Sequence, residues 1–167
     1  RWIGLQLSND ERRAAIAQLA GHFVARVARV DLDRGLVAPL TPANAYCYSG
    51  GWSPDDRTLA VAVLGESGRE EIALLPAHGT GPLRVLPTST NLFKSAGRWS
   101  PDGKTIVITQ IVPGSDRDLF TIDAEHGGAP RPLADDPGSQ GQDATISADG
   151  RWVTYDSEEG GTRQRFV

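Results

Sequence analysis

The sequence repeats one short phrase at a fixed interval. Residues 51–57 read GWSPDDR, residues 98–104 read RWSPDGK and residues 145–151 read TISADGR, so successive copies are 47 residues apart. The same shift superposes the apolar stretches that follow, TLAV at 58–61 on TIVI at 105–108. Agreement at so many positions of one shift indicates an internal repeat, which constrains the fold more than any other feature of the sequence.

Each repeat predicts four short strands. The β-branched run TIVITQ follows the phrase, DLFTID then alternates, and RPLA is a short last stretch. Pro and Asp favour a tight turn, and Gly103 and Gly150 supply a residue with positive φ, a place that Asp56 takes in its own copy. A 47-residue unit of four strands is typical of a β-propeller blade, which buries both faces only by stacking against neighbours around a channel.

The beginning of the chain departs from this spacing. Residues 1–5 resemble residues 151–155, but about nine extra residues follow them before the pattern resumes. Ser8 and Glu11 form a capping-box pattern, the run ERRAAIAQLA contains good helix formers, and Gly21 suits a helix end. These residues predict a short inserted helix near 9–20.

The predicted fold class is therefore all-β, a β-propeller of four-stranded antiparallel blades with one short inserted helix. About three and a half blades are expected: a partial blade at 1–42, whole blades at 43–89 and 90–136, and a partial blade at 137–167. Because a closed ring needs at least four blades, we expect either a piece of a larger propeller or two copies that self-associate to complete a ring. The first alternative is favoured.

Charge and composition narrow the classes of partner. A net charge of −4 argues against nucleic acid and anionic membranes, since both select basic surfaces. No run of 18 apolar residues is present, so no membrane insertion is expected. Cys47 is the only cysteine and is expected to be a small buried apolar residue.

The sequence contains no recognisable catalytic constellation. The stretch beginning at Gly51 starts like a G-x-S-x-G nucleophile elbow but has Asp55 where the second Gly belongs. The three histidines lack metal-ligand spacing, and the alternating carboxylates near Asp31 lack the remaining residues of a calcium loop. We therefore predict no catalytic residue, no metal site and no cofactor in this chain.

The phrase WSPDGK, followed by a β-branched strand, DLFTID, a Gly-Gly turn and RPLA, resembles the TolB-like (WD40-like) propeller repeat. The resemblance covers nearly the whole chain, with residues 9–21 as the exception. It implies a propeller that binds partner proteins, as in periplasmic TolB, or one that caps the active site of prolyl oligopeptidase-family serine peptidases. A periplasmic or extracytoplasmic location is implied by the resemblance alone.

The function predicted is a non-catalytic propeller module for binding or scaffolding a protein, peptide or other ligand. The alternative is a substrate-gating propeller of a prolyl oligopeptidase-type or dipeptidyl aminopeptidase-type serine peptidase, with its hydrolase domain outside this chain. A sensor domain after a membrane span is a third interpretation. Loops at 42–49, 88–94 and 137–143 precede first strands and are the expected binding loops. Their aromatic and amide side chains suit peptides or sugars, and those expected to bind are Tyr46, Tyr48, Asn91, Phe93 and Gln142.

Overall fold

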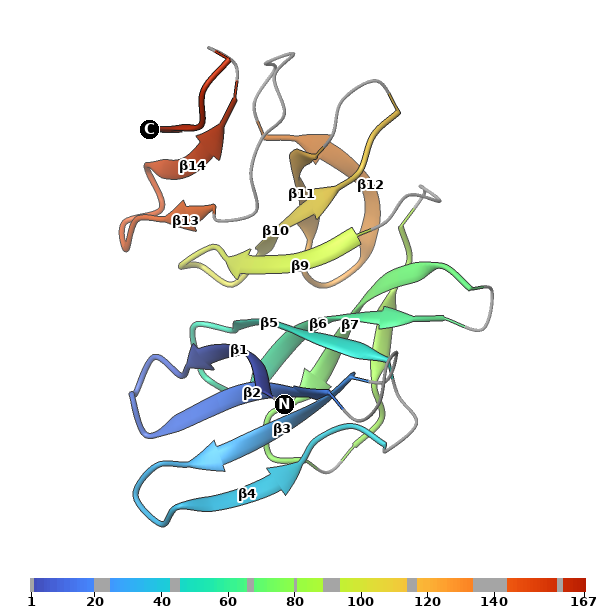
Figure 1. The fold of residues 1–167 in the computed structure, drawn as a ribbon, viewed down its shortest axis with the longest axis vertical. Coiled ribbons are helices and arrows are strands. Elements are labelled where there is room, and N and C mark those ends of the chain that lie inside the picture. The colour runs from blue at the N-terminus through green and yellow to red at the C-terminus, as the bar shows by residue number, and fades with distance from the viewer. Residues whose placement is uncertain are drawn as a thin grey trace.

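The computed structural model shows four antiparallel β-sheets that follow one another along the chain (Figure 1). It describes residues 2–19, 25–42, 46–65, 68–79, 81–88, 94–113, 117–133, 144–158 and 161–167. The first sheet contains β1 (Trp2–Leu7), β2 (Arg13–Leu19), β3 (Ala25–Asp31) and β4 (Leu36–Pro39), and the second contains β5 (Cys47–Trp52), β6 (Thr58–Leu64), β7 (Glu70–Pro76) and β8 (Arg84–Leu86). The third contains β9 (Lys94–Trp99), β10 (Thr105–Gln110), β11 (Asp118–Asp123) and β12 (Gly127–Pro132), and the fourth contains β13 (Thr145–Ile146), β14 (Val153–Ser157) and β15 (Gln164–Phe166).

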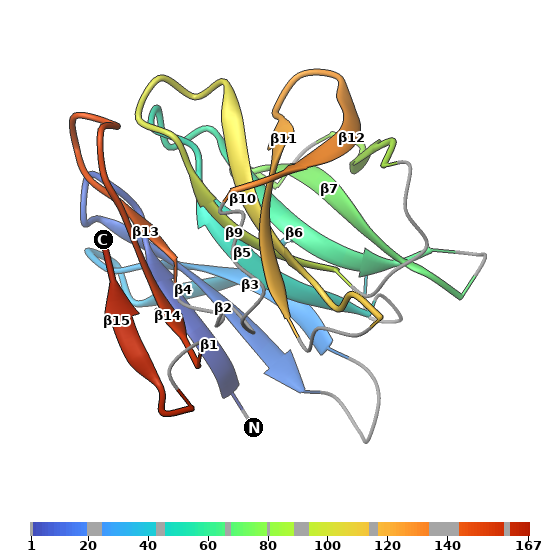
Figure 2. The same ribbon diagram turned by 90° about the horizontal axis from the view of Figure 1, so that it is seen from above.

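The four sheets are arranged as successive blades of a partial propeller. Within each sheet the strands are hydrogen-bonded in chain order, and the first strands contact one another in the series β1, β5, β9 and β13. The sheets therefore form an arc, with the first and fourth at its two ends (Figure 1), and the view turned by 90° also places β5 beside β9 (Figure 2). The prediction of an all-β propeller is confirmed. Its blade boundaries fall on or beside residues outside the described ranges and stay predictions.

The repeated phrase forms the same hairpin turn in every sheet. In the fourth sheet Ser147 Oγ donates to Asp149 Oδ1 at 2.6 Å and accepts from the Trp152 amide at 3.0 Å. The same bonds connect Ser8, Ser53 and Ser100 to the residues two and five positions later, with the same distances. The residue after the aspartate has positive φ in all four turns, namely Glu11, Asp56, Gly103 and Gly150. The predicted role of the phrase as a hairpin turn is confirmed.

The helix predicted near residues 9–20 is wrong, because residues 13–19 form strand β2. Ser8 is bonded as the first residue of a hairpin turn, and Glu11 has a φ of 57°, which no α-helix accepts. A shift of 45 rather than 47 residues superposes Ser8 and Asp10 on Ser53 and Asp55. Helix propensity is a weak preference, and here the packing of alanine-rich β2 between its neighbours overrides it.

The alignment of residues 1–5 with residues 151–155 is also wrong. Trp2 lies in β1, the first strand of its sheet, whereas Trp152 immediately precedes β14, the second strand of the fourth sheet. The first sheet accordingly has all four of its strands. In the described part of the chain there is no helix, and so none that is long and apolar enough to cross a membrane.

The core lies between the sheets, and β6 shows how it forms. Alternate residues of a strand point to opposite faces. Leu59 and Val61 pack toward the first sheet, whereas Ala60 and Ala62 pack toward the third sheet, and all four are essentially inaccessible to solvent. Burial on both faces explains why TLAVAVL is a continuous apolar run rather than an alternating one.

Two tryptophans join neighbouring sheets at the ends of their first strands. The indole Nε1 of Trp52 donates to the backbone oxygen of Gln6 at 3.0 Å, and that of Trp99 donates to the backbone oxygen of Gly51 at 3.0 Å. Each bond therefore runs from one first strand to the preceding first strand. The equivalent position in the fourth sheet is Ile146, which has no such donor. Trp52 and Trp99 thus form equivalent bonds, as expected of a repeat.

The hairpin turns also contact one another, and the chemistry of the first interface differs from that of the second. The Asp56 carboxylate accepts from the backbone amides of Asn9 at 2.7 Å and Asp10 at 2.9 Å, and from Asn9 Nδ2 at 2.8 Å. At the next interface Gly103 takes the place of Asp56 and Pro54 that of Asn9. A Cβ on Gly103 would lie 3.7 Å from the Pro54 ring. Hydrogen bonds between a carboxylate and amides thus join the first turn to the second. Packing of a glycine against a proline ring joins the second turn to the third.

The remaining face of the first sheet is apolar and exposed. Leu5 and Leu7 on β1 pair with Ile16 and Ala14 on β2, which places them on the same face as Val37 of β4. The exposed fractions of Leu5, Leu7 and Val37 are 61%, 51% and 54%. The expectation that a further blade or a second copy covers this end of the arc stays a prediction.

Candidate functional site

The first strands approach one another closely because they carry small residues. Gly50, Gly97 and Ala144 occupy equivalent positions, 47 residues apart. A Cβ on Gly50 would lie 2.7 Å from Ala96 Cβ of β9 and would overlap the Ala60 backbone oxygen of its own sheet, and one on Gly97 would lie 2.7 Å from the Val107 backbone oxygen of its own sheet. Neither position can hold a larger side chain without moving the backbone. The first strands therefore form a close-packed wall around which the four sheets are arranged.

The next residue of each first strand faces a shared space. Gln6, Gly51, Arg98 and Thr145 hold this position in the four sheets, and all four line one pocket of about 300 Å³. Arg165 of β15 also lines it. We call this the inner pocket. Four equivalent positions of a repeat converge here, so the pocket lies on the side of the sheets that faces the propeller axis.

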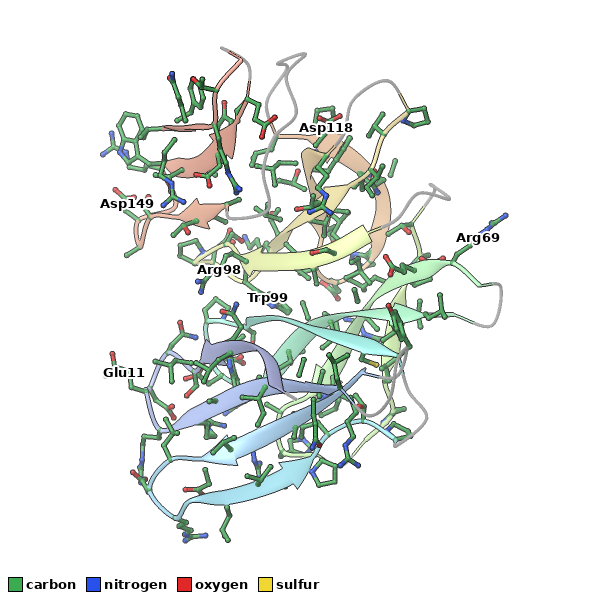
Figure 3. All side chains as sticks on the ribbon, in the orientation of Figure 1. Glu11, Arg69, Arg98, Trp99, Asp118 and Asp149 are labelled. Atoms are coloured by element: carbon green, nitrogen blue, oxygen red, sulfur yellow. The ribbon has the colours of Figure 1, made fainter. Side chains whose placement is uncertain are left out.

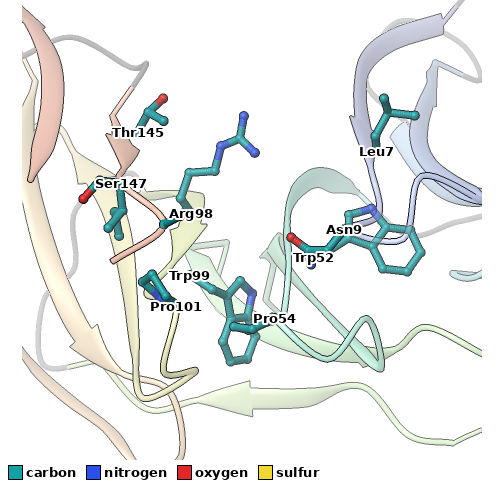
Figure 4. Close-up of a pocket in the computed structure, with 11 residues that line it drawn as sticks. Leu7, Asn9, Trp52, Pro54, Arg98, Trp99, Pro101, Thr145 and Ser147 are labelled. Carbon is teal, nitrogen blue, oxygen red and sulfur yellow. The ribbon is translucent and has the colours of Figure 1, made fainter. Parts of the chain in front are cut away.

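A second pocket of about 400 Å³ adjoins the first at the hairpin end of the strands (Figure 4). The two share Arg98 and Thr145. We call it the hairpin pocket, and it is lined by Leu7, Asn9, Trp52, Pro54, Arg98, Trp99, Pro101, Thr145, Ile146, Ser147 and Ala148. Both are of a size that ordinary ligand pockets have, and the hairpin pocket combines apolar rings with a few polar groups. Together they form one continuous candidate site along the first strands.

Arg98 is the residue that connects the two pockets. Its backbone is fixed on both sides, because Gly97 packs against the Val107 backbone oxygen and Trp99 bonds to Gly51. The side chain is exposed and extends away from Trp99 into the open space beside Thr145 (Figure 4). Figure 3 shows Arg98 and Trp99 in the interior of the arc. A rigid backbone thus presents a guanidinium to the site.

The electrostatic character of the site is positive. Arg98 and Arg165 line it, and none of the described residues that line either pocket is an aspartate or a glutamate. Arg165 Nε donates to Asp156 Oδ1 at 2.8 Å, and Arg163 forms a second ion pair with Asp156 at 3.0 Å. Two arginines share that carboxylate, so a positive excess remains beside Arg98. This contrasts with the net charge of −4 of the whole chain.

The hydroxyl groups of the site are of two kinds. Ser147 Oγ is committed to its turn, donating to Asp149 and accepting from Trp152. Thr145 is exposed at the junction of the pockets. Tryptophan Nε1 atoms are likewise committed to backbone oxygens, so the indoles offer only their apolar surfaces. The arrangement can hold an extended polar ligand by arginine, amide and hydroxyl contacts.

Other chemically reactive groups lie outside this site. Cys47 is buried in the core between the first and second sheets, as predicted, and burial raises the pKa of its thiol to about 11. Within the described ranges there is no group of three or more His, Cys, Asp and Glu side chains that could hold a metal ion. The carboxylate of Asp31 accepts from the Arg34 amide at 3.0 Å in the turn between β3 and β4.

The residues predicted to bind lie elsewhere or outside the described ranges. Tyr46 is half-buried just before β5, where its backbone oxygen accepts from the Leu64 amide at 3.0 Å. Tyr48 lies within β5, its backbone paired with Ala62. Asn91, Phe93 and Gln142 fall outside the described residues. The loops that contain these residues precede the first strands, whereas the hairpin turns follow them, and the role of the loops in binding stays a prediction.

Sequence reasoning missed Gln6, Arg98, Thr145 and Arg165. The signal was present for Arg98 and Thr145, because each is the first residue of a repeated phrase and stands 47 residues from the next copy. The rest of each phrase forms a turn, and the turn alone accounts for the repeat without assigning a role to its first residue. Gln6 matches Gly51, and so joins this set, only when the first sheet is aligned with the second by the 45-residue shift that the structure shows. Arg165 carries no such signal.

Comparison with solved structures identifies the fold. A putative TolB from Agrobacterium tumefaciens superposes with a TM-score of 0.81 and 25% sequence identity, over 99% of this chain and 57% of that one. The chain has a TolB-like β-propeller fold. TolB from Acinetobacter baumannii gives a TM-score of 0.72 at 18% identity, over 93% of this chain and 37% of that TolB. This chain thus spans about half the length, or less, of these TolB structures.

The TolB-like fold also occurs in peptidases. The β-propeller domain of the Trilobed protease from Pyrococcus furiosus, described as having an open velcro topology, gives a TM-score of 0.59 at 13% identity, over 98% of this chain and 67% of that domain. Neither the protein-family models nor the curated proteins compared with this sequence match it. The resemblance to TolB-like repeats, stated from the motifs, is confirmed for the fold.

Proposed function

We propose that this TolB-like propeller is a non-catalytic module that binds a protein or peptide along the inner wall of its sheets. The observation that supports this is the pair of adjoining pockets, which four equivalent strand positions and the following turns line. Arginine, amide, hydroxyl and indole groups are those that recognise polypeptide chains. The similarity to TolB along 99% of the chain agrees with this interpretation.

A library of displayed random peptides tests this function with the full natural protein as bait. Thr145→Trp fills the junction of the two pockets with an indole, and we expect it to abolish binding of the enriched peptides. Leu36→Trp is the matched control, because it adds the same side chain at an exposed position on outer strand β4. The proposed function would be refuted if the enriched peptides bound Thr145→Trp as tightly as Leu36→Trp, or if the library yielded no binder.

The second candidate function is the gating of substrate in a serine peptidase, which the similarity to the Trilobed protease propeller supports. In that case the hydrolase belongs to another part of the natural protein. A fluorophosphonate probe, which labels activated serines, distinguishes the two functions. We expect no labelling of the full natural protein, and labelling that a peptide substrate blocks would favour the gating function instead.

A further inference from the structure

We propose that the inner pocket recognises a carboxylate of the bound peptide, with Arg98 as its principal ligand. This inference rests on the proposed function and names the chemistry of the partner. Arg98 and Arg165 line one pocket of about 300 Å³ together with the amide of Gln6 and the hydroxyl of Thr145. A guanidinium binds a carboxylate through two parallel N–H donors, which gives both affinity and orientation.

The position of Arg98 favours this use over a structural one. Within the described part of the chain Arg98 forms no ion pair, whereas Arg12, Arg13, Arg163 and Arg165 each have a carboxylate partner. Its equivalents in the repeat are Gln6, Gly51 and Thr145. The arginine is therefore specific to the third sheet, and the repeated architecture does not need it. Neither does the turn, because its serine and aspartate form the repeated bonds without the preceding residue.

The neighbouring strand packs closely against the backbone at Arg98. Gly51 has no side chain at the equivalent position of β5, and a Cβ there would lie 2.8 Å from the Gly97 backbone oxygen and 3.4 Å from Arg98 Cα. The Cβ position at Gly51 is therefore occupied by the backbone of β9, and the two strands pack closely beside Arg98. Because the backbone on both strands is fixed by close contacts, little ordering of the protein is needed when a ligand binds.

The surroundings select an anion rather than a neutral group. The described lining of both pockets includes no acidic side chain that would compete with an incoming carboxylate for Arg98. The carboxylate can come from an Asp or Glu side chain or from a free C-terminus, and the two sources share this chemistry.

Fluorescence-labelled peptides from the library test the inference by affinity. Arg98→Gln should lower the affinity for an acidic peptide at least about tenfold, which is the effect of losing a charged hydrogen-bonded pair. The affinity of Arg98→Lys for the acidic peptide should fall between those of the natural protein and Arg98→Gln, because lysine keeps the charge but not the paired donors. Arg34→Gln is the matched control, since Arg34 is an exposed arginine in the β3–β4 turn, and it should bind like the natural protein.

Changes in the peptide identify the source of the carboxylate. Amidation of the C-terminus should weaken binding if the terminus is the source, and Asp→Asn or Glu→Gln replacement should do so if a side chain is. Equal affinity for acidic and neutral peptides, or Arg98→Gln within about twofold of the natural protein, would overturn the inference. Loss of all binders in the Thr145→Trp variant would still support the proposed function, so the two failures are distinguishable.

Discussion

The hairpin turn of the second sheet contacts the first through a carboxylate, whereas the turn of the third sheet contacts the second through a glycine. At the first interface Asp56 accepts from two backbone amides and one side-chain amide of the preceding turn. At the second, Pro54 has no N–H to donate, and Gly103 packs against its ring. The same backbone arrangement is thus stabilised in two ways, and each requires a matching pair of residues.

The two interfaces also differ around their tryptophans. Trp52 is buried, with an exposed fraction of 6%, and the Arg13 guanidinium lies 5.3 Å from its ring centroid. Trp99 is half-buried. Both indoles donate to the preceding strand at 3.0 Å. The comparison shows that the indole bond is the common element of the repeat, whereas the charged contacts are additions at the first interface.

Truncation of the tryptophans should give the largest effect. Trp52→Ala is expected to lower the free energy of unfolding by about 3–5 kcal/mol, because it removes a buried ring and leaves the Gln6 backbone oxygen without its donor. Trp99→Ala should cost less, since that ring is already partly exposed. Urea unfolding followed by circular dichroism measures both. Equal losses in the two variants would contradict the difference between the interfaces.

Transfer of the carboxylate to the second interface should give a smaller effect. Gly103→Asp is expected to destabilise the protein by about 1–2 kcal/mol, because the new carboxylate meets Pro54, which has no N–H. Adding Pro54→Asn should restore part of that stability by supplying an amide donor. Thermal unfolding of the single and double variants measures this, and a double variant less stable than Gly103→Asp alone would count against the matching rule.

The smallest effect concerns acid pH and the turn aspartates. The Ser8 hydroxyl and the Arg12 amide lower the pKa of Asp10 to about 2, and equivalent bonds lower the pKa of Asp102. A carboxyl whose pKa is lowered by folding stabilises the protein above its unfolded value, and that contribution is lost as pH falls from about 4 toward 2. Asp10→Asn should therefore flatten the pH dependence of Tm in this window. Asp102→Asn should flatten it in the same direction, because the pKa of Asp102 is lowered by equivalent bonds, and a pH profile unchanged in both variants would contradict this account.

The sequence was sufficient to predict the architecture but not the first sheet. The 47-residue repeat, the turn phrase and the positive φ at Asp56, Gly103 and Gly150 all follow from residues visible in the chain. The helix prediction failed at Glu11, because capping-box and propensity signals are local, and the burial of β2 between strands is not. Ser8 and Asp10 are the sequence signal for the hairpin turn of the first sheet, but they lie two residues away from the position that the 47-residue spacing predicts.

The candidate site was harder to predict than the fold. Arg98 belongs to a motif whose other members form a turn, and its exposure to two pockets depends on how close β5 lies to β9. That approach is set by Gly50 and Gly51, where a Cβ would lie 2.7 Å from Ala96 Cβ and 2.8 Å from the Gly97 backbone oxygen of the neighbouring sheet, respectively. Which residues of neighbouring repeats line a shared pocket depends on how the sheets pack, and the spacing alone does not give it.

A double-mutant cycle between Asn9 and Asp56 tests most directly the claim that matched turn pairs join the sheets. Asp56→Gly should cost about 2 kcal/mol by leaving the Asn9 and Asp10 amides unpaired, and Asn9→Pro should also destabilise by removing a donor. The double variant re-creates the pair found at Pro54 and Gly103. The account predicts that it is more stable than the sum of the single losses by at least about 1 kcal/mol, whereas additivity within about 0.5 kcal/mol would contradict it.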